Sequence, residues 1–588
     1  MNLKWYTLLV ILSLFLSHTR SLTLLTEKVS PVSQVVFISM ANNSYRTVYA
    51  FAREMHPKTV KTDIQYGTAG FRTKATNLGY VMYRMGLLAV LRARYKRGVI
   101  GVMITASHNP EPDNGVKLVD PKGEMLDQSW EKWATKFANV GDDQLEETIN
   151  EIIKEYDIPM TDRVEIVVGK DTRPSSPSLA KSVMDGVLAL AGKPIDYGIV
   201  TTPQLHYFVV CKNTNRQYGE PTEDGYYKKL TGAFKKLRGE TYTNGNYKNR
   251  LLYDGANGVG AKKIKYFQEL LGNTLKIEMF NDAIIGSGKL NYMCGADYVK
   301  SQQKFPTGVP VEPNVRCCSV DGDADRLIYY YMDENNGFHL MDGDRMATLI
   351  AGYLKEVLEE TGIDLNLGLV QTAYANGAST DYIAKKLQVP VACVSTGVKH
   401  LHHKALDYDI GVYFEANGHG TIIFSTNAKE KLREAAKNNT ISDERRLAAE
   451  ALLNLIDLIN ETVGDAISDM LLIETILHAK GWDIQQWEDA YTDLPNRLMK
   501  VTVQDRNVIT TTDAERVCVT PEGLQAEIDS AAAKYKKGRS FVRPSGTEDV
   551  VRVYAEAATR EEADELAVEV AKKVHELAGG TGNPPELN

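Results

Sequence analysis

The hexapeptide at 105–110, Thr-Ala-Ser-His-Asn-Pro, places a serine hydroxyl in a polar turn directly after an apolar run. The run at 99–104 is short and rich in β-branched residues, which predicts a buried strand. Asn109-Pro110 then ends any regular element, because proline lacks an N–H and disfavours helix at the residue before it. Ser107 is therefore expected on a rigid turn at a strand end, where α/β proteins place reactive side chains. Alone, such a serine more often only hydrogen-bonds its own backbone.

A second polar cluster lies far downstream, at Asp321-Gly322-Asp323-Ala324-Asp325-Arg326. Three carboxylates this close repel one another unless a divalent cation neutralises them, and all-oxygen ligation suits Mg²⁺ or Mn²⁺. An EF-hand does not fit, since Arg326 stands where that loop needs glycine and Met332 where it needs glutamate. The remaining alternative is a solvated acidic loop. The apolar runs on both sides, ending at Val320 and resuming at Leu327, favour a metal site held between strands.

Near the C-terminus, one short stretch combines a guanidinium, two hydroxyls and a glycine that permits close backbone approach. With a second arginine nearby, it supplies what a phosphate cradle needs: charged donors and N–H groups around a tight turn. By itself the stretch fits a loop that merely turns equally well. The candidate phosphate-binding residues are Arg543, Pro544, Ser545, Gly546, Thr547 and Arg552.

A carboxylate–carboxamide pair and one lysine carry weaker signals. Glu415-Ala416-Asn417 follows the apolar run at 410–414, and such a pair at a strand end can bind two sugar hydroxyls, or one hydroxyl and an amide. The alternative is an ordinary turn at Asn417-Gly418. Lys117 alternates with apolar neighbours and can project from a strand toward Ser107, although a solvated lysine is the commoner case.

The composition limits the class of function. The 588 residues are 43% hydrophobic and 24% charged, which predicts a globular protein of about three to five domains. The net charge is −8 and no Lys/Arg block stands out, so nucleic acid is an unfavourable partner, whereas an anionic small substrate is compatible with local arginines. The 6 cysteines show no Cys-x-x-Cys spacing, which argues against a disulfide framework or zinc site and favours reduced, buried thiols.

The beginning of the chain carries a signal-like pattern. Lys4 precedes an apolar run at 5–16, which has the shape of a secretory signal peptide and is too short for a stable membrane span. Residues 1–21 therefore give an argument for secretory targeting. The competing interpretation is that Met40 is the functional start and that residues 1–39 are an extension outside the fold.

From about residue 60, short apolar strands alternate with amphipathic helices, which is the α/β pattern. From about residue 494 shorter alternating strands follow, and 425–446 is interpreted as a solvated helix or loop. The pattern predicts three α/β units and a smaller α+β unit at the C-terminus. The expected strands include 99–104, 164–169, 251–254, 315–320 and 327–331, and the expected helices include 82–97, 178–191 and 560–577.

The four motifs, in this order, resemble the α-D-phosphohexomutase superfamily: the serine turn, the triple-aspartate loop, the Glu-x-Asn loop and the Arg-Pro-Ser-Gly-Thr loop. The match extends from 65–72 to 553–556. Within the superfamily the chain is most similar to the eukaryotic phosphoacetylglucosamine mutase family, because Glu415-Ala416-Asn417-Gly418 replaces the Gly-Glu-x-Ser-Gly of most members. The stretches 254–258 and 464–469 also fit that family.

The resemblance implies a protein of four domains, three mixed α/β domains of related topology plus a smaller α+β C-terminal domain, arranged in a heart shape around a central cleft. Each domain would contribute one motif to that cleft. The expected parts are the extension 1–39, a phosphoserine domain 55–212, a metal-binding domain 225–332, a sugar-binding domain 333–480 and a phosphate-binding domain 494–580.

The resemblance also implies the reaction. Ser107 would be carried as phosphoserine, and Asp321, Asp323, Asp325 and a phosphoserine oxygen would hold one Mg²⁺. The enzyme would interconvert N-acetylglucosamine 6-phosphate and 1-phosphate through a 1,6-bisphosphate that turns end for end. This step leads to UDP-N-acetylglucosamine and is cytosolic in eukaryotes, so we expect a cytoplasmic enzyme starting at Met40.

The remaining roles also follow from the resemblance. Arg72 would contact the phosphate on Ser107, and Arg326 would add a second positive contact. Lys117 and His108 both match positions near the nucleophile, and either one can be the general acid or base. Glu415, Ala416 and Asn417 would bind the sugar, and the Arg543 stretch the distal phosphate.

Two other functions are weighed against this one. A mutase acting on glucose or mannose phosphates is the nearer alternative, and Asn417 argues against it. A catalytically silent phosphosugar-binding relative would need a broken motif, and the serine, the three aspartates and Arg543 are all present. In either case we expect a small phosphosugar as ligand, with no nucleic acid and no membrane as partner.

Overall fold

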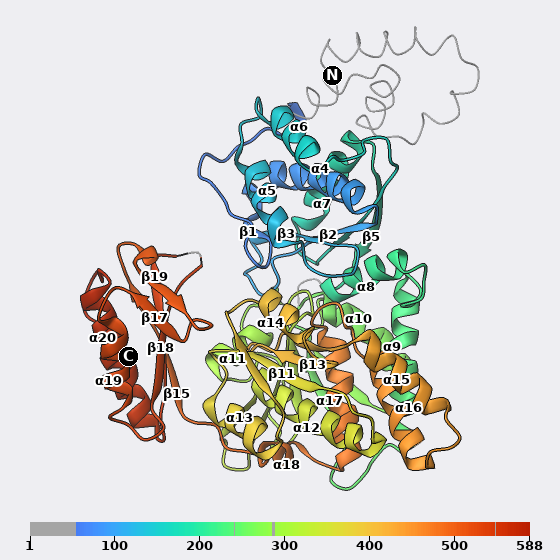
Figure 1. Ribbon diagram of the computed structural model, residues 1–588, viewed down its shortest axis with the longest axis vertical. Coiled ribbons are helices and arrows are strands. Elements are labelled where there is room, and N and C mark those ends of the chain that lie inside the picture. Colours follow the sequence, from blue (N-terminus) through green and yellow to red (C-terminus); the bar gives the residue numbers. More distant parts are fainter. Residues whose placement is uncertain (1–53, 240, 285–287, 547, 588) are drawn as a thin grey trace.

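The computed structural model describes residues 54–587, apart from 240, 285–287 and 547. The predicted extension 1–39 and Thr547 therefore lie outside the described residues. The described chain is a mixed α/β protein with four main sheets, and no sheet in it closes into a barrel (Figure 1). This confirms the predicted fold class, while the heart-shaped outline stays a prediction. No helix within the described ranges has the length and apolar character needed to cross a membrane.

The first sheet has strand order β1-β3-β2-β4-β5, with β2, β4 and β5 parallel. Its strands are β1 Phe71–Lys74, β2 Ile100–Ile104, β3 Asp113–Val119, β4 Glu165–Lys170 and β5 Lys193–Ile199. Its helices are α4 Gly79–Lys96, α5 Gln128–Asn139, α6 Leu145–Glu155, α7 Ser176–Ala189 and α8 Thr202–Asn213.

Strand β2 is buried on both faces, as expected for a strand between helical layers. Ile100, Val102 and Ile104 pack in a core with α4, α5 and α7, whereas Met103 points to the opposite core, toward α8. Burial on both faces explains why this strand is an unbroken apolar run, and it fixes where the chain leaves the sheet just before Ser107.

The second sheet has strand order β10-β9-β8-β6-β7. The hairpin of β8 and β9 pairs Val320 with Leu327, so the six residues 321–326 form the connection between the strands. Its strands are β6 Arg250–Asp254, β7 Lys276–Phe280, β8 Cys317–Val320, β9 Leu327–Met332 and β10 Phe338–Met341. Its helices are α9 Glu223–Arg238, α10 Val259–Leu271 and α11 Ala296–Gln302.

The third sheet has strand order β12-β11-β13-β14, and its last two strands form an antiparallel hairpin. Its strands are β11 Leu367–Thr372, β12 Val391–Val394, β13 Ile410–Phe414 and β14 Gly420–Phe424. The helices of this region are α12 Gly343–Thr361, α13 Gly377–Asp381, α14 Val398–Ala405, α15 Thr426–Lys437, α16 Asp443–Leu458, α17 Ala466–Lys480 and α18 Ile484–Glu488.

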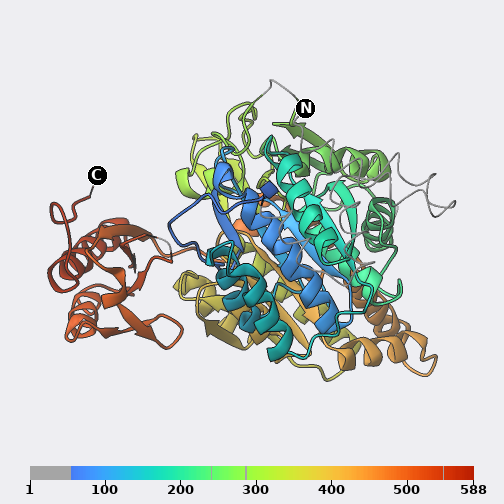
Figure 2. The same ribbon diagram turned by 90° about the horizontal axis from the view of Figure 1, so that it is seen from above.

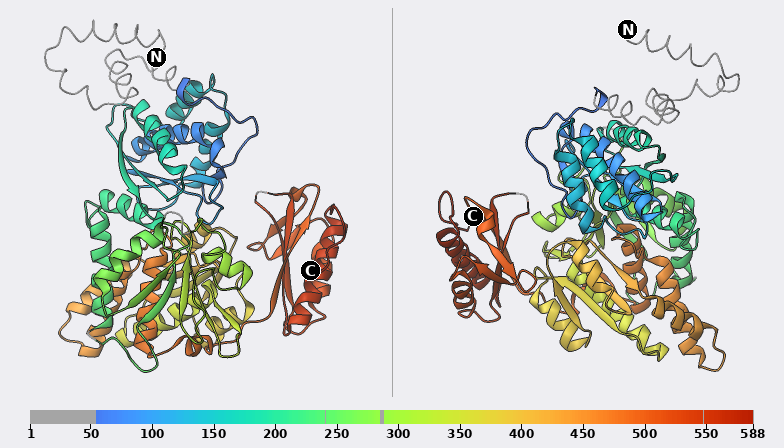
Figure 3. Two further views of the ribbon diagram at one scale, coloured as in Figure 1. Left: turned by 180° about the vertical axis from the view of Figure 1, so that it is seen from behind. Right: turned by 45° about the horizontal axis from the view of Figure 1, so that its top comes forward.

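The C-terminal unit contains the three-stranded sheet β15-β19-β18 and the hairpin β16–β17. It stands to one side of the rest of the molecule, and the views from above and from behind show the same separation (Figures 2 and 3). Its strands are β15 Asn496–Thr502, β16 Thr510–Thr512, β17 Val517–Thr520, β18 Arg539–Pro544 and β19 Val550–Glu556, and its helices are α19 Leu524–Ala532 and α20 Arg560–Leu577.

The hydrophobic cores explain this arrangement. One face of each of the first three sheets contributes to a single shared core, in which Met103 of β2, Val320 of β8 and Val412 of β13 all take part. The C-terminal unit has its own core, which includes Val553 and Val570. The first three sheets are therefore fixed relative to one another by packing. The C-terminal unit has a core of its own and meets the third-sheet unit through a small cluster of Ala373, Phe541 and Tyr554.

Candidate active site

Ser107 lies in the turn that leaves β2, and its side chain is fully buried. Its backbone is left-handed, with φ 52°, a conformation that costs a non-glycine residue about 1–3 kcal/mol unless its surroundings hold it. Three contacts do so: the Ser107 N–H donates to Thr105 Oγ1 (2.9 Å), and the Ser107 carbonyl accepts from Arg173 Nη2 (3.1 Å) and Asn291 Nδ2 (2.8 Å). The hydroxyl is thereby aimed at the second sheet, where it donates to Asp321 Oδ2 at 2.6 Å.

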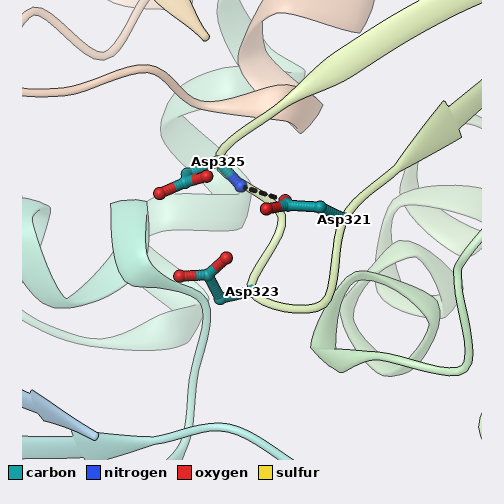
Figure 4. A group of neighbouring side chains, drawn as sticks. All are labelled: Asp321, Asp323 and Asp325. Carbon is teal, nitrogen blue, oxygen red and sulfur yellow. Dashed lines mark hydrogen bonds between the residues drawn. The ribbon is translucent and has the colours of Figure 1, made fainter. Parts of the chain in front are cut away.

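Asp321, Asp323 and Asp325 lie in the loop between β8 and β9 and are buried, with one carboxylate oxygen of each within 4.8 Å of the others (Figure 4). Asp321 Oδ1 accepts from the N–H groups of Asp325 (3.0 Å) and Arg326 (3.2 Å), and Asp323 Oδ2 accepts from the Thr202 hydroxyl (2.6 Å). Burial, followed by the charges of Asp325 and Asp323, raises the pKa of Asp321 well above its ordinary range.

Two oxygens of this cluster, Asp323 Oδ1 and Asp325 Oδ1, are buried and have no hydrogen-bond partner. Such acceptors are costly unless something ligates them. Three convergent carboxylates, two of which keep an unsatisfied oxygen, are a donor set of the hard, all-oxygen kind that Mg²⁺ takes. The residues present therefore fit a divalent cation.

Lys117 lies on β3 opposite Met103 of β2, and its side chain reaches the aspartate loop. Its Nζ is 3.3 Å from Asp323 Oδ2 and 3.2 Å from Asp325 Oδ2. Burial alone would lower the pKa of this ammonium, but the two carboxylates outweigh burial and raise it. The predicted projection from a strand is present, and it brings the ammonium to the carboxylates.

Arg72, Arg326 and His108 are close enough for their charges to affect one another's pKa, and His108 lies beside the Ser107 hydroxyl. Burial, followed by the like charge of Arg326, lowers the pKa of Arg72 on β1. The Nε atoms of both arginines are buried and have no hydrogen-bond partner. His108 Nδ1 lies 3.4 Å from Ser107 Oγ, and burial together with Arg326 and Arg72 lowers the pKa of His108 to about 2. Unsatisfied cationic donors suit an oxyanion, and the charge of these two arginines reaches His108, which neighbours the hydroxyl.

The Glu-x-Asn loop is the turn between β13 and β14 and packs against the aspartate loop. Asn417 Nδ2 donates to Glu415 Oε2 (3.1 Å), and the Leu327 N–H donates to the Gly418 carbonyl (3.0 Å). Gly418 has φ 84°, and a Cβ there would lie 1.8 Å from Leu327 O, so only glycine fits. The residues between the strands are Glu415, Ala416, Asn417, Gly418 and His419.

The Arg543 stretch lies in the C-terminal unit, at the turn from β18 to β19. Arg543 pairs in register with Arg552, so both guanidinium side chains arise from the same end of the sheet. Ser545 is buried and Gly546 is exposed. Arg543 Nε donates to Glu515 Oε1 at 2.9 Å, within the same unit. The structure thus brings the first three motifs together, and it holds the fourth on a separate unit.

Sequence reasoning missed several residues that shape the site. Arg173 and Asn291 orient the Ser107 turn, and Thr202, the first residue of α8, donates its hydroxyl to Asp323. His419 Nδ1 lies 2.8 Å from the Asp325 carbonyl oxygen. The signal for His419 was its place directly after the turn at Asn417-Gly418. The other three belong to elements distant in sequence, and no local pattern points to them.

Family models match most of the described chain. The phosphoglucomutase/phosphomannomutase α/β/α domain I matches 69–144 and 138–216, and domain II of phosphoacetylglucosamine mutase AMG1 matches 219–328. Domain III of the same enzyme matches 342–482, and the phosphoglucomutase/phosphomannomutase C-terminal domain matches 498–573.

Relatives match over nearly their whole length. Phosphoacetylglucosamine mutase of Homo sapiens is 55% identical over 532 residues, which is 90% of this chain and 97% of the relative. The crystal structure of Aspergillus fumigatus N-acetylphosphoglucosamine mutase in complex with GlcNAc-6P and magnesium is 49% identical, with a TM-score of 0.86 over 91% of this chain and 99% of that chain. A serine-to-alanine variant of the A. fumigatus enzyme, in complex with glucose 1,6-bisphosphate, is 48% identical with a TM-score of 0.86, again over 91% and 99% of the two chains.

Proposed function

The chain belongs to the phosphoacetylglucosamine mutase family of the α-D-phosphohexomutases, and from this premise we propose how its own residues perform the reaction. The enzyme is an isomerase of the phosphotransferase type that interconverts N-acetylglucosamine 6-phosphate and N-acetylglucosamine 1-phosphate. Mg²⁺ is its cofactor. The observation that carries the assignment of residues is the contact of the Ser107 hydroxyl with Asp321, one of three clustered carboxylates. The unpartnered Nε atoms of Arg72 and Arg326 support it.

Asp321, Asp323 and Asp325, with an oxygen of the phosphorylated Ser107, would hold one Mg²⁺. When bound there, the ion would supply charge withdrawal from the phosphoryl group. Arg72 and Arg326 neutralise the remaining oxygens of that group, which their unsatisfied Nε donors support. Phosphoryl transfer depends mainly on such positioning and charge neutralisation.

The transfer itself runs between two oxygens. The free hydroxyl of the bound monophosphate forms a bond to phosphorus and gives its proton to the acid–base residue. The bond from phosphorus to Ser107 Oγ breaks, and that oxygen takes up a proton and becomes a hydroxyl again. The product is the 1,6-bisphosphate. Lys117 and His108 remain the two candidates for the proton: His108 lies nearer to Ser107, and Lys117 nearer to the carboxylates.

Glu415, Ala416 and Asn417 would bind the sugar from the turn that packs on the aspartate loop. The distal phosphate would be held by the C-terminal unit, through Arg543, Pro544, Ser545, Gly546, Thr547 and Arg552. Because the bisphosphate must turn end for end before its second phosphate reaches Ser107, the same cradle must accept either phosphate. The separate core of the C-terminal unit supports its role as the moving part.

The four-part division at 55–212, 225–332, 333–480 and 494–580 belongs to this proposal. Its support is one sheet for each part, with the qualification that β10, which follows residue 333, is the edge strand of the second sheet. We also propose that the enzyme works in the cytoplasm on the route to UDP-N-acetylglucosamine, with neither nucleic acid nor membrane as partner.

The experiment that tests this proposal follows turnover and phosphorylation together. The full chain with Mg²⁺ and N-acetylglucosamine 6-phosphate is expected to produce the 1-phosphate, measured by ³¹P NMR, and peptide mass spectrometry is expected to place a phosphate on Ser107. The kcat/KM for glucose 6-phosphate and mannose 6-phosphate should be lower. Phosphate on another residue, or a preference for glucose phosphate, would overturn the assignment of Ser107 or of Asn417 respectively.

A further inference from the structure

The C-terminal unit meets the unit of the third sheet near the linker between them. Arg539 Nη1 and Nη2 donate to the carbonyls of Ala373 (2.8 Å) and Ala375 (2.7 Å). Glu556, which pairs with Arg539, accepts from the Gly377 N–H at 3.1 Å. These contacts lie beside the covalent connection, where Ala373 also packs against Phe541 and Tyr554.

A second contact lies at the tip of the hairpin β16–β17. Glu515 Oε2 accepts from the Thr396 N–H (3.0 Å) and from the Thr396 hydroxyl, and its other oxygen, Oε1, accepts from Arg543 Nε at 2.9 Å. One carboxylate therefore bridges the proposed phosphate-binding arginine and a loop of another unit. That loop also borders the first unit, since a Cβ on Gly397 would lie 3.3 Å from Thr68 Cγ2.

The hairpin tip holds this carboxylate at a cost in backbone strain. Asp513, Ala514 and Glu515 have successive φ values of 49°, 56° and 68°, all in the left-handed region that non-glycine residues avoid. The side chain of Glu515 is 15% exposed and that of Arg543 22% exposed, so the pair is largely withdrawn from water. Strained backbone of this kind persists only where the surroundings impose it.

We propose that Glu515 is a positioning residue. In the absence of substrate its carboxylate occupies the position on Arg543 that the distal phosphate takes, and it releases Arg543 when a phosphosugar binds. The inference rests on the role proposed above for Arg543. A carboxylate and a phosphate compete for the same N–H edge of a guanidinium. When phosphate takes Arg543, Glu515 loses one of its partners, and the contact with Thr396 is free to rearrange as the C-terminal unit moves.

The competition has a use in this reaction. A cradle that binds phosphate too tightly would hold the bisphosphate in one orientation. The Glu515 carboxylate can return to Arg543 and displace the distal phosphate, so that the phosphate is released without exposing the arginine to solvent. Glu515 would thus lower the affinity for phosphosugar and permit the intermediate to turn.

The test measures binding of N-acetylglucosamine 6-phosphate to the full chain with Mg²⁺ by calorimetry. Glu515→Gln keeps the shape and removes the charge, and it should tighten binding by about threefold to tenfold, the range of a partly exposed ion pair. Kinetically, KM and kcat should both fall. A purely structural role for Glu515 would weaken binding, so the gain in affinity is diagnostic. Binding of N-acetylglucosamine, which lacks the phosphate, should not change.

Asp513→Asn is the matched control, because it removes the same charge from the same hairpin but from a residue paired with Arg516. It should leave the affinity unchanged. In an Arg543→Ala background, Glu515→Gln should have no effect on affinity, since the competition has been removed.

The outcomes separate this inference from the function proposed above. If Arg543→Ala does not weaken phosphosugar binding, the phosphate cradle is wrongly assigned. If Arg543→Ala weakens binding but Glu515→Gln leaves it unchanged or weakens it, the cradle stands and the role of Glu515 is wrong. Equal tightening by Asp513→Asn would also overturn that role, because the gain in affinity would then come from removing any negative charge on the hairpin and not from Glu515 in particular.

Discussion

The hydroxyl of Ser107 lies 2.6 Å from Asp321 Oδ2, although the two residues are 214 positions apart in the chain. The close approach extends to the backbone, since a Cβ on Gly322 would lie 2.6 Å from the Ser107 carbonyl oxygen. Both loops leave sheets that share one hydrophobic core. The packing of the fold therefore holds the Ser107 turn and the aspartate loop against each other.

Ser107→Ala should lower turnover by at least about a thousandfold, because the variant has no oxygen to carry the phosphoryl group. The ³¹P NMR assay should show no 1-phosphate, and intact mass should show no added phosphate. Ser178→Ala, at an exposed serine of α7, is the matched control and should keep full activity. Wild-type activity of Ser107→Ala would end the phosphoserine mechanism.

Asp323→Asn should remove the response to Mg²⁺. In the wild-type protein, binding of the ion to the folded state should raise Tm as the Mg²⁺ concentration increases, since a ligand of the native state stabilises it. The variant should show a much smaller rise and little activity at any Mg²⁺ concentration, measured by differential scanning fluorimetry and the turnover assay. A wild-type Tm that does not change between EDTA and Mg²⁺ would contradict this prediction.

Gly418→Ala should lower the free energy of unfolding by at least about 2 kcal/mol, because φ 84° and the contact with Leu327 O leave no room for a methyl group. Gly232→Ala is the control of opposite sign. It lies within α9, where an added Cβ would meet no atom within 4 Å apart from its chain neighbours and the helix's own backbone, and it should stabilise the protein by about 0.5–1 kcal/mol. Urea denaturation measures both. Equal effects of the two substitutions would show that the Gly418 turn is not constrained as described.

His339 of β10 should make stability depend on pH. Its imidazole contacts Glu488 Oε1 (2.9 Å) and Asp333 Oδ2 (3.2 Å); burial alone would lower its pKa, but these carboxylates outweigh burial and raise it. A raised folded-state pKa stabilises the protein below the unfolded value of about 6.5, and this stabilisation disappears as the pH rises through the folded value.

The stability difference between the wild type and His339→Gln should therefore be larger at pH 6 than at pH 9, as measured by Tm in matched buffers. A difference that grows with pH would mean that the histidine is bound in its neutral form. Because the pair is partly exposed, raising the salt concentration should reduce the difference at pH 6.

Local patterns predicted the elements that carry the motifs with small errors at the ends. The helix expected at 82–97 is α4, Gly79–Lys96, and the helix expected at 560–577 is α20, with the same bounds. The segment 425–446, left open between helix and loop, contains α15 and the start of α16. These segments were predictable because their periodicity and their end signals are encoded within a few turns of the chain.

The contacts between distant elements were not predictable in the same way. Lys117 was expected to point toward Ser107, and its strand register places its ammonium against Asp323 and Asp325. Glu515 lies in a polar turn that gives no local sign of a role, and its partners are set by how two units meet. In the sequence, Thr202 looks like an ordinary residue at the start of a helix, and only the fold places its hydroxyl against Asp323.

Because the C-terminal unit has a core of its own, substitutions in that core and in the shared core should affect activity differently. A substitution that weakens the packing of Val570 in that core would lower the fraction of molecules whose C-terminal unit is folded and can bind phosphate as proposed. Ser107 and the aspartate loop would keep their arrangement, because they depend on the shared core. Such an enzyme would show a raised apparent KM, and a higher substrate concentration would restore its turnover. Damage to the shared core would allow no such rescue.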